Sequence, residues 1–551
     1  MQERPWHRHY DYSVPETIRY PRLPVADLLQ IPANAYPDKA ATYFYGSELT
    51  FWELRQQVLR MANALGAMGV SKGDRVGLHL PNCPQYVICY YAVLSLGAIV
   101  VNMNPLYTPA ELREIAGQTG MATLITFDMA LAEVKSFHKD VSISCIIVTR
   151  VTDYISGIPR STAKDFDLGE AWHHFSEVLE GCTDTRRPRV EIAPEDAAMI
   201  QFTGGTTGVP KGAVLTHGNV VASSMIATLW GGESLIPPER RFVMAIIPYF
   251  HVYGNICVIN WSILNCATQI VVPRFDIDEL LGIMANFKEI MYFPSVPTMI
   301  NAIINHPKAQ EMELGRKLGM LNSGAAPMPQ EMIDQVKDMG IYFSEGWGMS
   351  ETTSMGITNP VLGIKKVGSI GIPIPDTDVK LVDIADGVTE VSPGEPGEII
   401  IKGPTVMKEY WNNPEETANQ LKDGWLYTGD IAVQDEDDYF FIVDRKKDMI
   451  IAGGFNIYPR DIDEVLYQHP KIVDAVTIGV PDEYRGETVK AFIVLKEGET
   501  ASEEEIITFC REKLTAYKVP KLIEFRNELP KSAVGKVLRK ILREEEIAKK
   551  K

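Results

Sequence analysis

The sequence predicts an α/β fold: a large domain of parallel-type sheets covered by helices, a small β subdomain, and a small, mobile α/β domain at the end. Before about residue 366, apolar runs of strand length alternate with helical patterns. After it, short apolar runs are separated by Gly and Pro, as in β structure. A chain of 551 residues is also too long for one core.

The first elements that the pattern predicts are a helix over Phe51–Met68 and a strand over Val76–Leu80. The run from Val76 to Ala110 carries no charge, but its uninterrupted apolar part, about Tyr86–Val101, is shorter than the ~20 residues that a membrane-spanning helix needs. We therefore expect a buried helix and then a buried strand, and no transmembrane segment. Further strands are expected at Ala98–Met103, Ala122–Thr126 and Ile143–Val148.

A polar connection is expected over Asp153–Arg189. The neighbouring residues His173 and His174 lie in it, with no further metal-ligand side chains nearby in the sequence. We interpret this pair as the surface of a helix and not as a metal site.

The loop with the strongest chemical signal is TGGTTGVPKGAVLTH, Thr203 to His217. It follows the apolar run Ala197–Phe202 and precedes a helical pattern that starts at about Asn219. Glycine lets backbone N–H groups approach an anion, threonine adds hydroxyl donors, and Lys211 adds a positive charge. The spacing differs from the Walker loop, so the pattern predicts a phosphate site without implying kinase or GTPase chemistry.

Later strands each open into loops of small, polar or aromatic residues. Parallel strands bind ligands at their carboxyl ends, so we expect these loops to converge on one pocket. The strands are expected at Phe242–Ile247, Gln269–Val272, Ile290–Phe293, Leu318–Leu321 and Tyr342–Phe343.

The last part of the chain is predicted as two units. The β subdomain covers about 366–445 within an N-terminal domain of 1–445, and a C-terminal domain covers 446–551. The subdomain's strands are expected at Asp378–Val382, Glu398–Ile401 and up to Val443. Helices are expected near Asp461–Gln468, Glu503–Lys513 and Lys536–Lys550, and the final lysines are interpreted as a solvated end.

Charge and cysteine content narrow the class of function. A net charge of −18 argues against non-specific nucleic-acid binding, which needs a basic surface. The seven cysteines are scattered and never spaced C-x-x-C, as in a protein of a reducing compartment. The first residues, MQERPWHRHYDY, show no signal peptide. These observations predict a cytoplasmic protein.

Taken together, the motifs resemble the adenylate-forming enzymes, a superfamily of acyl-CoA synthetases, aryl-CoA ligases, luciferases and peptide-synthetase adenylation domains. The resemblance covers the chain from about Phe44 to Leu542. Within the superfamily, the sequence is most similar to fatty-acyl-CoA ligases. The motifs that carry it are Thr203–His217, Tyr249–Gly254, Ser323–Pro327, Gly346–Glu351, Gly424–Asp430, Asp444–Asp448, Gly453–Pro459 and Pro530–Lys536.

The resemblance implies an ATP site. Lys536, Glu351 and Lys211 would be catalytic, and Thr206 and Glu351 would help to bind Mg²⁺. Lys447 would be the hinge between the two domains. The remaining ATP and AMP contacts would be Thr203, Gly204, Gly205, Thr206, Thr207, Gly208, Ala325, Ala326, Trp347, Gly348, Ser350, Asp430 and Arg445.

The same resemblance implies an acyl pocket and a CoA tunnel. The acyl chain would be bordered by His251, Tyr253, Val296 and Gly324, with His251 as a wall rather than a base, because a carboxylic acid is already ionised near pH 7. The CoA tunnel would involve Gly453, Gly454 and Phe455.

The implied reaction joins a fatty acid to CoA in two steps, and the expected substrate is a long-chain acid. The carboxylate attacks ATP to give acyl-AMP and pyrophosphate, the C-terminal domain swings about Lys447, and the CoA thiol displaces AMP. The alternatives are a medium-chain or aryl acid–CoA ligase, a luciferase-like oxygenase, a carrier-protein-loading domain and a non-catalytic nucleotide-binding protein. Homodimer formation and peripheral membrane contact stay open.

Overall fold

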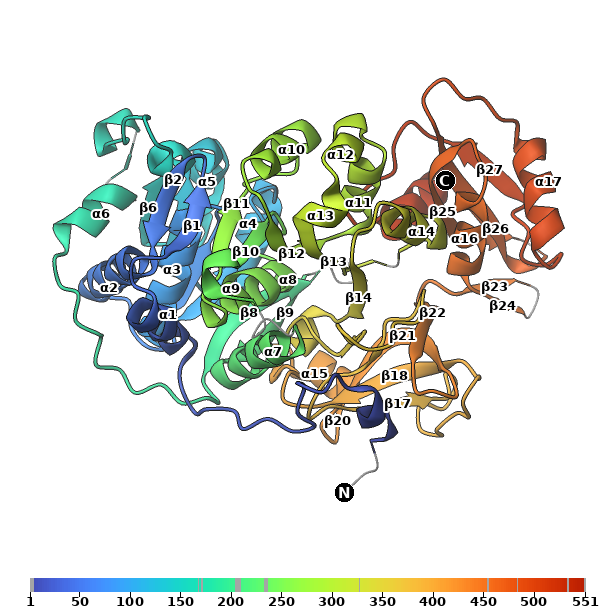
Figure 1. Cartoon of the computed structure of the whole chain (residues 1–551), viewed down its shortest axis with the longest axis horizontal. Helices are drawn as coiled ribbons and strands as arrows, with labels where there is room; N and C mark the ends of the chain where they lie inside the picture. The colour runs from blue at the N-terminus through green and yellow to red at the C-terminus, as the bar shows by residue number, and fades with distance from the viewer. Residues whose placement is uncertain are drawn as a thin grey trace.

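The protein is described by a computed structural model over residues 4–166, 168–169, 172–203, 210–231, 236–326, 328–452, 455–482, 484–532 and 535–549. Within these residues the strands form four sheets. Three of them belong to what we call the large lobe. The fourth, from β23 onward, belongs to the small lobe, drawn in red in Figure 1. The predicted α/β class, with helices around parallel strands, is confirmed.

The first parallel sheet carries the strands that open into the predicted pocket loops. Its central strands, from β14 to β1, run parallel, and β2, β15 and β16 are antiparallel additions. In spatial order the strands are β16 (Ile372–Pro373), β15 (Ile357–Thr358), β14 (Phe343–Trp347), β13 (Leu318–Ser323), β12 (Ile290–Ser295), β10 (Phe242–Ala245), β11 (Thr268–Val271), β1 (Ala40–Phe44) and β2 (Ser47–Thr50).

The second parallel sheet carries the glycine-rich loop at one edge. Its order is β19 (Glu409–Tyr410), β9 (Lys211–Thr216), β8 (Ala197–Thr203), β4 (Ile99–Asn102), β3 (Arg75–Leu78), β5 (Thr123–Phe127), β6 (Cys145–Thr149) and β7 (Trp172–His174). β9 runs antiparallel to β8, and Thr203 pairs with Lys211. The loop therefore joins two strands of a hairpin, and the expected direct passage from loop to helix is wrong, because β9 comes between them.

The helices pack around these sheets. Thr50 and Thr216 cap α2 and α7 by accepting hydrogen bonds from backbone N–H groups of the first turn. The helices of the large lobe are α1 (Gln30–Ala35), α2 (Phe51–Ala67), α3 (Pro84–Ser95), α4 (Pro109–Thr119), α5 (Leu131–Phe137), α6 (Phe175–Gly181), α7 (His217–Trp230), α8 (Val252–Gly254), α9 (Trp261–Leu264), α10 (Ile277–Ala285), α11 (Pro297–Ile304), α12 (Pro307–Glu311), α13 (Leu314–Lys317), α14 (Gln330–Asp338) and α15 (Pro414–Gln420), with a π-helical turn at Asn255–Asn260 between α8 and α9.

Helix α3 explains the long charge-free run. Its residues from Pro84 to Leu94 are all buried. The hydroxyl of Tyr86 donates to Asn102 Oδ1 of the second sheet at 2.6 Å and to the carbonyl of Tyr249, beyond β10 of the first sheet, at 3.1 Å. The helix thus bridges the two sheets and has no solvated face on which to place a charge. Among the described residues, no helix is both long and apolar enough to cross a bilayer.

The third sheet is antiparallel and corresponds to the predicted β subdomain. It contains β17 (Asp378–Val382), β18 (Gly397–Lys402), β20 (Leu421–Lys422), β21 (Trp425–Gln434) and β22 (Phe440–Arg445). The beginning of the chain, dark blue in Figure 1, lies beside this sheet although it is far from it in sequence. An ion pair between Arg4 and Asp378 joins the two segments.

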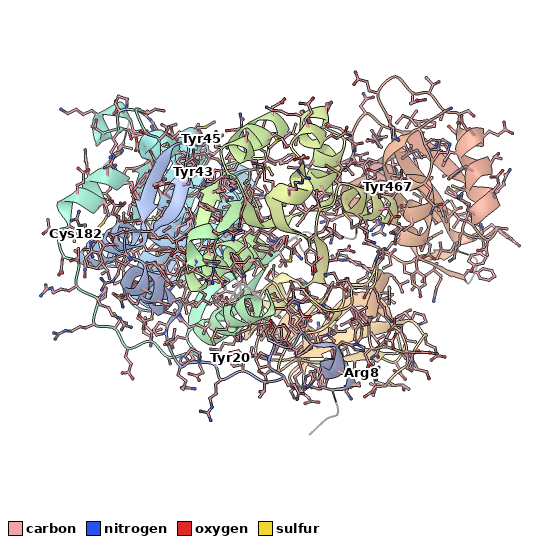
Figure 2. All side chains as sticks on the ribbon, in the orientation of Figure 1. Arg8, Tyr20, Tyr43, Tyr45, Cys182 and Tyr467 are labelled. Carbon is pink, nitrogen blue, oxygen red and sulfur yellow. The ribbon has the colours of Figure 1, made fainter. Side chains whose placement is uncertain are left out.

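The small lobe has its own core under a mostly antiparallel sheet. Its strands are β23 (Ile450–Ala452), β24 (Phe455–Ile457), β25 (Ile472–Asp482), β26 (Gly486–Leu495) and β27 (Leu522–Phe525), and its helices are α16 (Pro459–Tyr467), α17 (Glu503–Lys513) and α18 (Arg539–Lys549). Tyr467, labelled in Figure 2, donates to Asp474 across this lobe.

Two local predictions are wrong. His173 and His174 lie on strand β7, and His174 is buried with its Nε2 2.9 Å from Ser161 Oγ, so the pair is not a helix surface. The last helix begins at Arg539, which leaves Lys536 in the turn before it. Of the final lysines, Lys549 is half exposed and its Nζ pairs with Glu524 and Glu546, and Lys550 and Lys551 lie outside the described residues.

Candidate active site

A cavity of about 1510 Å³ lies where loops of the first, second and third sheets meet the small lobe. In Figure 1, β14, β21 and β22 lie on the side of the large lobe that faces the C-terminal lobe. The predicted convergence is observed for the loops after β10, β13 and β14, and not for those after β11 and β12. The cavity is lined by Thr203, Lys211, His251, Tyr253, Gly324, Ala325, Trp347, Gly348, Ser350, Glu351, Asp430, Arg445, Lys447 and Lys536.

The glycine-rich loop enters and leaves at the cavity wall. Thr203 ends β8 and Lys211 begins β9, and both line the cavity. The Nζ atom of Lys211 pairs with Glu416 Oε1 of α15 at 2.5 Å and lies 5.8 Å from the centre of the Tyr410 ring. The predicted phosphate contacts between these ends, Gly204, Gly205, Thr206, Thr207 and Gly208, lie outside the described residues.

Asp430 is the centre of a group of polar contacts in the cavity. It is only 6% exposed and pairs in register with Arg445 on the neighbouring strand. Its Oδ2 accepts from Trp347 Nε1 at 2.8 Å, and its Oδ1 lies 3.1 Å from Arg445 Nε. A carboxylate offers about four lone-pair sites, so these two partners leave capacity for two more donors. The geometry suits recognition of a vicinal diol held against the Trp347 ring.

Two glycines shape the loop beside Trp347. A Cβ on Gly356 would lie 2.6 Å from Trp347 Cζ3, and a Cβ on Gly348 would lie 1.8 Å from the Ser354 carbonyl oxygen. Ala325, on the loop after β13, has a left-handed φ of +66°, a conformation that costs a non-glycine residue energy and that clusters at functional sites. The neighbouring Ala326 is not among the residues that line the cavity.

Glu351 is a second buried carboxylate of the cavity, at 5% exposure. Burial raises its pKa, and a hydrogen bond from the Tyr410 hydroxyl to Oε1, 2.7 Å long, opposes that rise. Mg²⁺ is usually bound by one or two carboxylates together with phosphate oxygens and water. Glu351 fits such an ion, and no cage of three or more His, Cys, Asp or Glu side chains occurs in the part of the chain that the structure describes.

Lys536 brings the small lobe into the cavity. It follows Gly535, whose φ is +69°, and a Cβ at Gly535 would lie 2.1 Å from Thr298 Oγ1 of α11 in the large lobe. The turn is closed by Lys536 N–H donating to Ser532 Oγ at 3.2 Å. Burial, together with the charge of Arg445, lowers the pKa of Lys536 to about 7. Lys447, in the turn between the lobes, also has a lowered pKa, for the same two reasons.

His251 lies close to Lys536. Burial and the positive charge of Lys536 lower the pKa of His251 to about 4, and its Nδ1 accepts from the Tyr253 N–H at 3.2 Å. The imidazole is therefore neutral at pH 7, which suits a wall of the cavity. The Tyr253 hydroxyl donates to Asn322 Oδ1 at 2.8 Å, and a Cβ on Gly324 would meet the Tyr253 ring at 3.3 Å.

An apolar channel continues from this wall into the large lobe. Along β13 the lining residues Met320, Asn322 and Gly324 are spaced two apart, so they share one face of the strand. Four residues at ~3.3 Å each give a length of about 13 Å from Gly324 to Met320. Lining residues also come from α7 (Ala227 and Trp230) and from the helical segment that contains the π-helical turn (Cys257 and Trp261), at helical spacings of three and four. We define the apolar channel by the lining residues Ala227, Trp230, Cys257, Trp261, Met320, Met355 and Val361.

Several predicted residues are not brought to the cavity. Val296 is fully buried before α11 and does not line it. Phe455 is 52% exposed on β24, with its ring stacked on Tyr517 at 4.6 Å between centroids. The other two predicted CoA-tunnel residues, Gly453 and Gly454, lie outside the described residues.

The sequence analysis missed the partners of the predicted residues. Tyr410, Glu416, Thr298 and Ser532 hold or border Glu351, Lys211, Gly535 and Lys536. No local motif marks Tyr410, Glu416 or Thr298, whereas Ser532 lies in the motif Pro530–Lys536. The only signal in the sequence is that Tyr410 and Glu416 lie close together, in the segment Tyr410-Trp411-Asn412-Asn413-Pro414-Glu415-Glu416. This segment is placed by its pairing with β9, a strand far from it in the sequence.

Comparison with family models and curated sequences gives matches over most of the chain. A model described as "AMP-binding enzyme" matches residues 29–411, and one described as "AMP-binding enzyme C-terminal domain" matches residues 461–536. A protein from Bacillus subtilis (strain 168) named long-chain-fatty-acid–CoA ligase is 43% identical over 558 residues, 99% of both chains. One of the same name from Escherichia coli O157:H7 is 37% identical over 559 residues, 98% of both chains.

Two solved structures with the same fold cover almost the whole of this chain. The anthranilate CoA ligase AuaEII in complex with anthranoyl-AMP has a TM-score of 0.86 at 27% identity, covering 96% of this chain and 98% of the other. ATP-bound MatB from Rhodopseudomonas palustris has a TM-score of 0.83 at 27% identity, covering 94% and 98%. Apo MatB scores 0.74, so the arrangement of this chain is nearer to the ATP-bound form.

Proposed function

The chain belongs to the AMP-binding enzyme family, and from that premise we propose that it is an ATP-dependent ligase that joins a fatty acid to CoA through an acyl-adenylate. The observation that carries the proposal is a single cavity with two ends. One end holds Asp430, Glu351 and Lys536, and the other is the apolar channel. A nucleotide and an aliphatic acid bound there would meet head to head, and relatives named long-chain-fatty-acid–CoA ligase support this substrate class.

In the first step the acid's carboxylate attacks the α-phosphorus of ATP and pyrophosphate leaves. We assign the phosphates to the loop from Thr203 to Lys211, with Thr206 sharing the metal ion with Glu351. When bound, Mg²⁺ would neutralise phosphate charge. The ammonium of Lys536 would lie between the carboxylate and the α-phosphate and offset the charge that develops there. Lys211 would leave Glu416 for the phosphates, because phosphate oxygens carry more negative charge.

The adenosine would be held on the other side of the cavity. The Trp347 ring would stack on adenine beside Ala325 and Ala326, and Asp430 would accept from the ribose hydroxyls with its two remaining lone-pair sites. Arg445 Nε lies 3.1 Å from that carboxylate and helps to hold it in place. Gly348 and Ser350 complete the loop that closes over the nucleotide.

In the second step the CoA thiol attacks the acyl carbonyl and AMP leaves. Phe455, Gly453 and Gly454 would line the path of the pantetheine, and Phe455 lies away from the cavity in this arrangement. A rotation of the C-terminal domain, 446–551, about Lys447 against the N-terminal domain, 1–445, would exchange Lys536 for these residues. The higher similarity to ATP-bound than to apo MatB supports reading this arrangement as the adenylate-forming one.

The apolar channel favours aliphatic acids of long chain over aryl acids. Its walls are Met320, Met355, Trp230 and Val361, and the lining residues from Gly324 to Met320 extend over about 13 Å. His251, Tyr253, Gly324 and Val296 would surround the carboxyl end of the chain. We place the reaction in the cytoplasm, because all seven cysteines are free thiols and the reaction uses ATP and CoA.

The test is pyrophosphate release with ATP, Mg²⁺ and a series of acids: octanoate, palmitate and a cinnamic acid, each with and without CoA. The proposal expects palmitate to give the highest kcat/KM and acyl-CoA to form only when CoA is present. Preference for the cinnamic acid would instead identify an aryl acid–CoA ligase. No pyrophosphate with any acid would overturn the proposal.

A further inference from the structure

Four residues that line the apolar channel also belong to a second apolar cluster. Trp230, Met320, Met355 and Val361 line the channel, and all four also pack in a cluster that includes Trp6 and Val14 from the beginning of the chain. These walls therefore have the channel on one side and the first residues of the chain on the other. We call residues 4–20 the N-terminal arm.

The N-terminal arm contacts Trp230, at the end of α7, directly. The ring of Tyr10 lies edge-on to the Trp230 ring, with centroids 5.2 Å apart and an interplanar angle of 79°. The Tyr10 hydroxyl donates to the Pro373 carbonyl at 2.8 Å, and Trp230 Nε1 donates to the Asn359 carbonyl at 2.8 Å. The indole is thus held between the arm and the chain segment that follows β15.

The arm is fastened to the third sheet along its length, although it contributes no strand to any of the sheets in the described residues. Asp376 accepts from the hydroxyls of Thr17 and Tyr20 and from the Ile18 N–H. Arg4 pairs with Asp378 at 2.8 Å. Figure 2 shows Arg8 and Tyr20 along the lower edge of the molecule, where the arm crosses this sheet.

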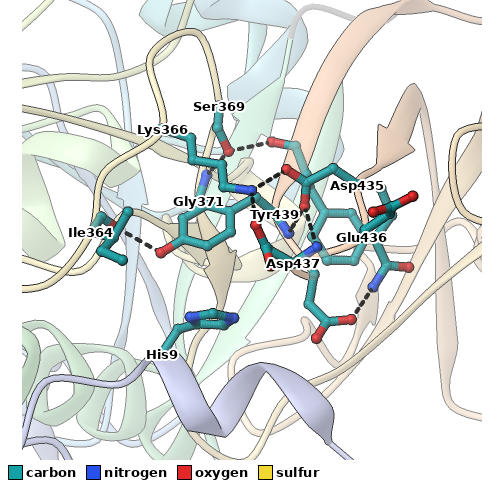
Figure 3. A network of polar contacts seen from close by, with 12 residues as sticks. His9, Ile364, Lys366, Ser369, Gly371, Asp435, Glu436, Asp437 and Tyr439 are labelled. Carbon is teal, nitrogen blue, oxygen red and sulfur yellow. Dashed lines mark hydrogen bonds and ion pairs between the residues drawn. The ribbon is translucent and has the colours of Figure 1, made fainter.

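The arm also holds the segment that carries Val361. Asp11 Oδ2 accepts from the Leu362 N–H at 2.8 Å. From the other side, the Tyr439 hydroxyl donates to the Ile364 carbonyl at 2.6 Å, and Lys366 pairs with Asp435 and Asp437 (Figure 3). His9 of the arm packs edge-on against the Tyr439 ring, 5.3 Å away, which closes the network.

We propose that the N-terminal arm sets the length of acyl chain that the enzyme accepts, by fixing Trp230 and Val361 as the closed end of the apolar channel. Trp230 is the specificity-determining residue because it lines the channel, and Tyr10 is a positioning residue that acts through it. This inference rests on the proposed function. A pocket distinguishes substrates that differ by one methylene about 10- to 200-fold when its end wall is rigid. The arm supplies that rigidity from outside the channel.

The test compares kcat/KM for saturated acids of about eight to about twenty carbons in wild type, Tyr10→Ala, Tyr10→Phe and Tyr12→Ala. Tyr10→Ala removes the ring behind Trp230, so the ratio of kcat/KM for the longest acid to that for the preferred acid should rise about tenfold, through a lower KM for the long acid. Tyr10→Phe keeps the ring and should keep the wild-type profile. Tyr12, 82% exposed, is the matched control and should also keep it.

Trp230→Leu is the second variant, which opens the channel end directly and should shift the profile in the same direction. If Tyr10→Ala does not fold, as judged by its circular dichroism and melting temperature, Tyr10→Leu replaces it. An unchanged profile in Tyr10→Ala, or in the Tyr10→Leu that replaces it, or an equal loss for every acid, would overturn the inference. Wild-type enzyme that releases no pyrophosphate with any fatty acid would instead overturn the proposed function.

Discussion

Lys536 is a buried cation whose charge the first step requires. Burial and Arg445 hold its pKa at about 7 in the free enzyme, so the ammonium is present below that pH and is lost as the pH rises through it. We predict that kcat/KM for pyrophosphate release falls above pH ~7, because this quantity reports the free enzyme. The corresponding fall in kcat should occur at higher pH, since bound phosphates favour the charged form of Lys536. In Lys536→Arg the side chain is always charged, so this fall in kcat/KM with rising pH should disappear. If the fall is unchanged in this variant, another group causes it.

Removing the Lys536 side chain should separate the two steps. In Lys536→Ala, adenylate formation should fall about 10²- to 10³-fold, because a charge that faces the reacting groups is lost. Thioester formation from supplied acyl-AMP and CoA should continue, since the lysine does not serve that step in our proposal. The measurement is pyrophosphate release for the first step and acyl-CoA formation for the second. Lys521→Ala, an exposed lysine of the same lobe, is the control. An equal loss in both steps would contradict the assignment.

The Tyr410 hydroxyl should affect how tightly Mg²⁺ is held. Its hydrogen bond to Glu351 opposes the rise in that carboxyl's pKa, so its loss should leave Glu351 protonated to higher pH. We predict that Tyr410→Phe raises the Mg²⁺ concentration for half-maximal rate about 10- to 100-fold, as for other residues that support a metal ligand. Tyr467→Phe, which loses a hydroxyl bond to Asp474 in the small lobe, should not change it. Titration of the rate with Mg²⁺ at fixed ATP measures both; equal midpoints would remove Tyr410 from the site.

At the scale of an element, the turn before α18 docks one lobe on the other. A Cβ at position 535 would clash with Thr298 Oγ1 at 2.1 Å, so Gly535→Ala should weaken this docking and slow adenylate formation more than thioester formation. Gly498→Ala is a matched control, because Gly498 has a similar φ of +80° but nothing within 4 Å of its Cβ position. Adding Thr298→Ala to Gly535→Ala should recover part of the rate. The same loss in both glycine variants would show backbone strain rather than docking.

Elements set by local patterns were predicted well from sequence. The apolar runs placed β5, β13 and β17 to within two residues, and α17 is as predicted, because periodicity is a local property. The hairpin strand β9 was missed because Lys211–Thr216 reads equally well as a loop leading to a helix. His174 was misplaced because its burial depends on Ser161, a distant partner. Most of the described residues that the motif resemblance singled out line the cavity, but the resemblance did not identify Tyr410 or Glu416, whose positions depend on the non-local pairing of β19 with β9.

At the scale of the whole molecule, the two lobes meet at a turn that carries Lys447. Proline at this position would fix φ near −65° and restrict rotation about the backbone. We predict that Lys447→Pro retains adenylate formation in the present arrangement and slows thioester formation at least about tenfold, because lobe motion would then limit turnover. Lys447→Ala controls for the side chain. Rapid-quench measurement of each step distinguishes them, and normal thioester formation in the proline variant would place the pivot elsewhere.

The account's central claim is that the carboxylate is first joined to AMP in the shared cavity and only then transferred to CoA. The most direct measurement is a single turnover with radiolabelled palmitate, ATP and Mg²⁺, first without CoA and then with it. We predict that labelled acyl-AMP accumulates in amounts close to that of the enzyme, together with pyrophosphate, and is converted to labelled acyl-CoA when CoA is added. Formation of ADP and phosphate, or of acyl-CoA without any preceding acyl-AMP, would contradict the claim.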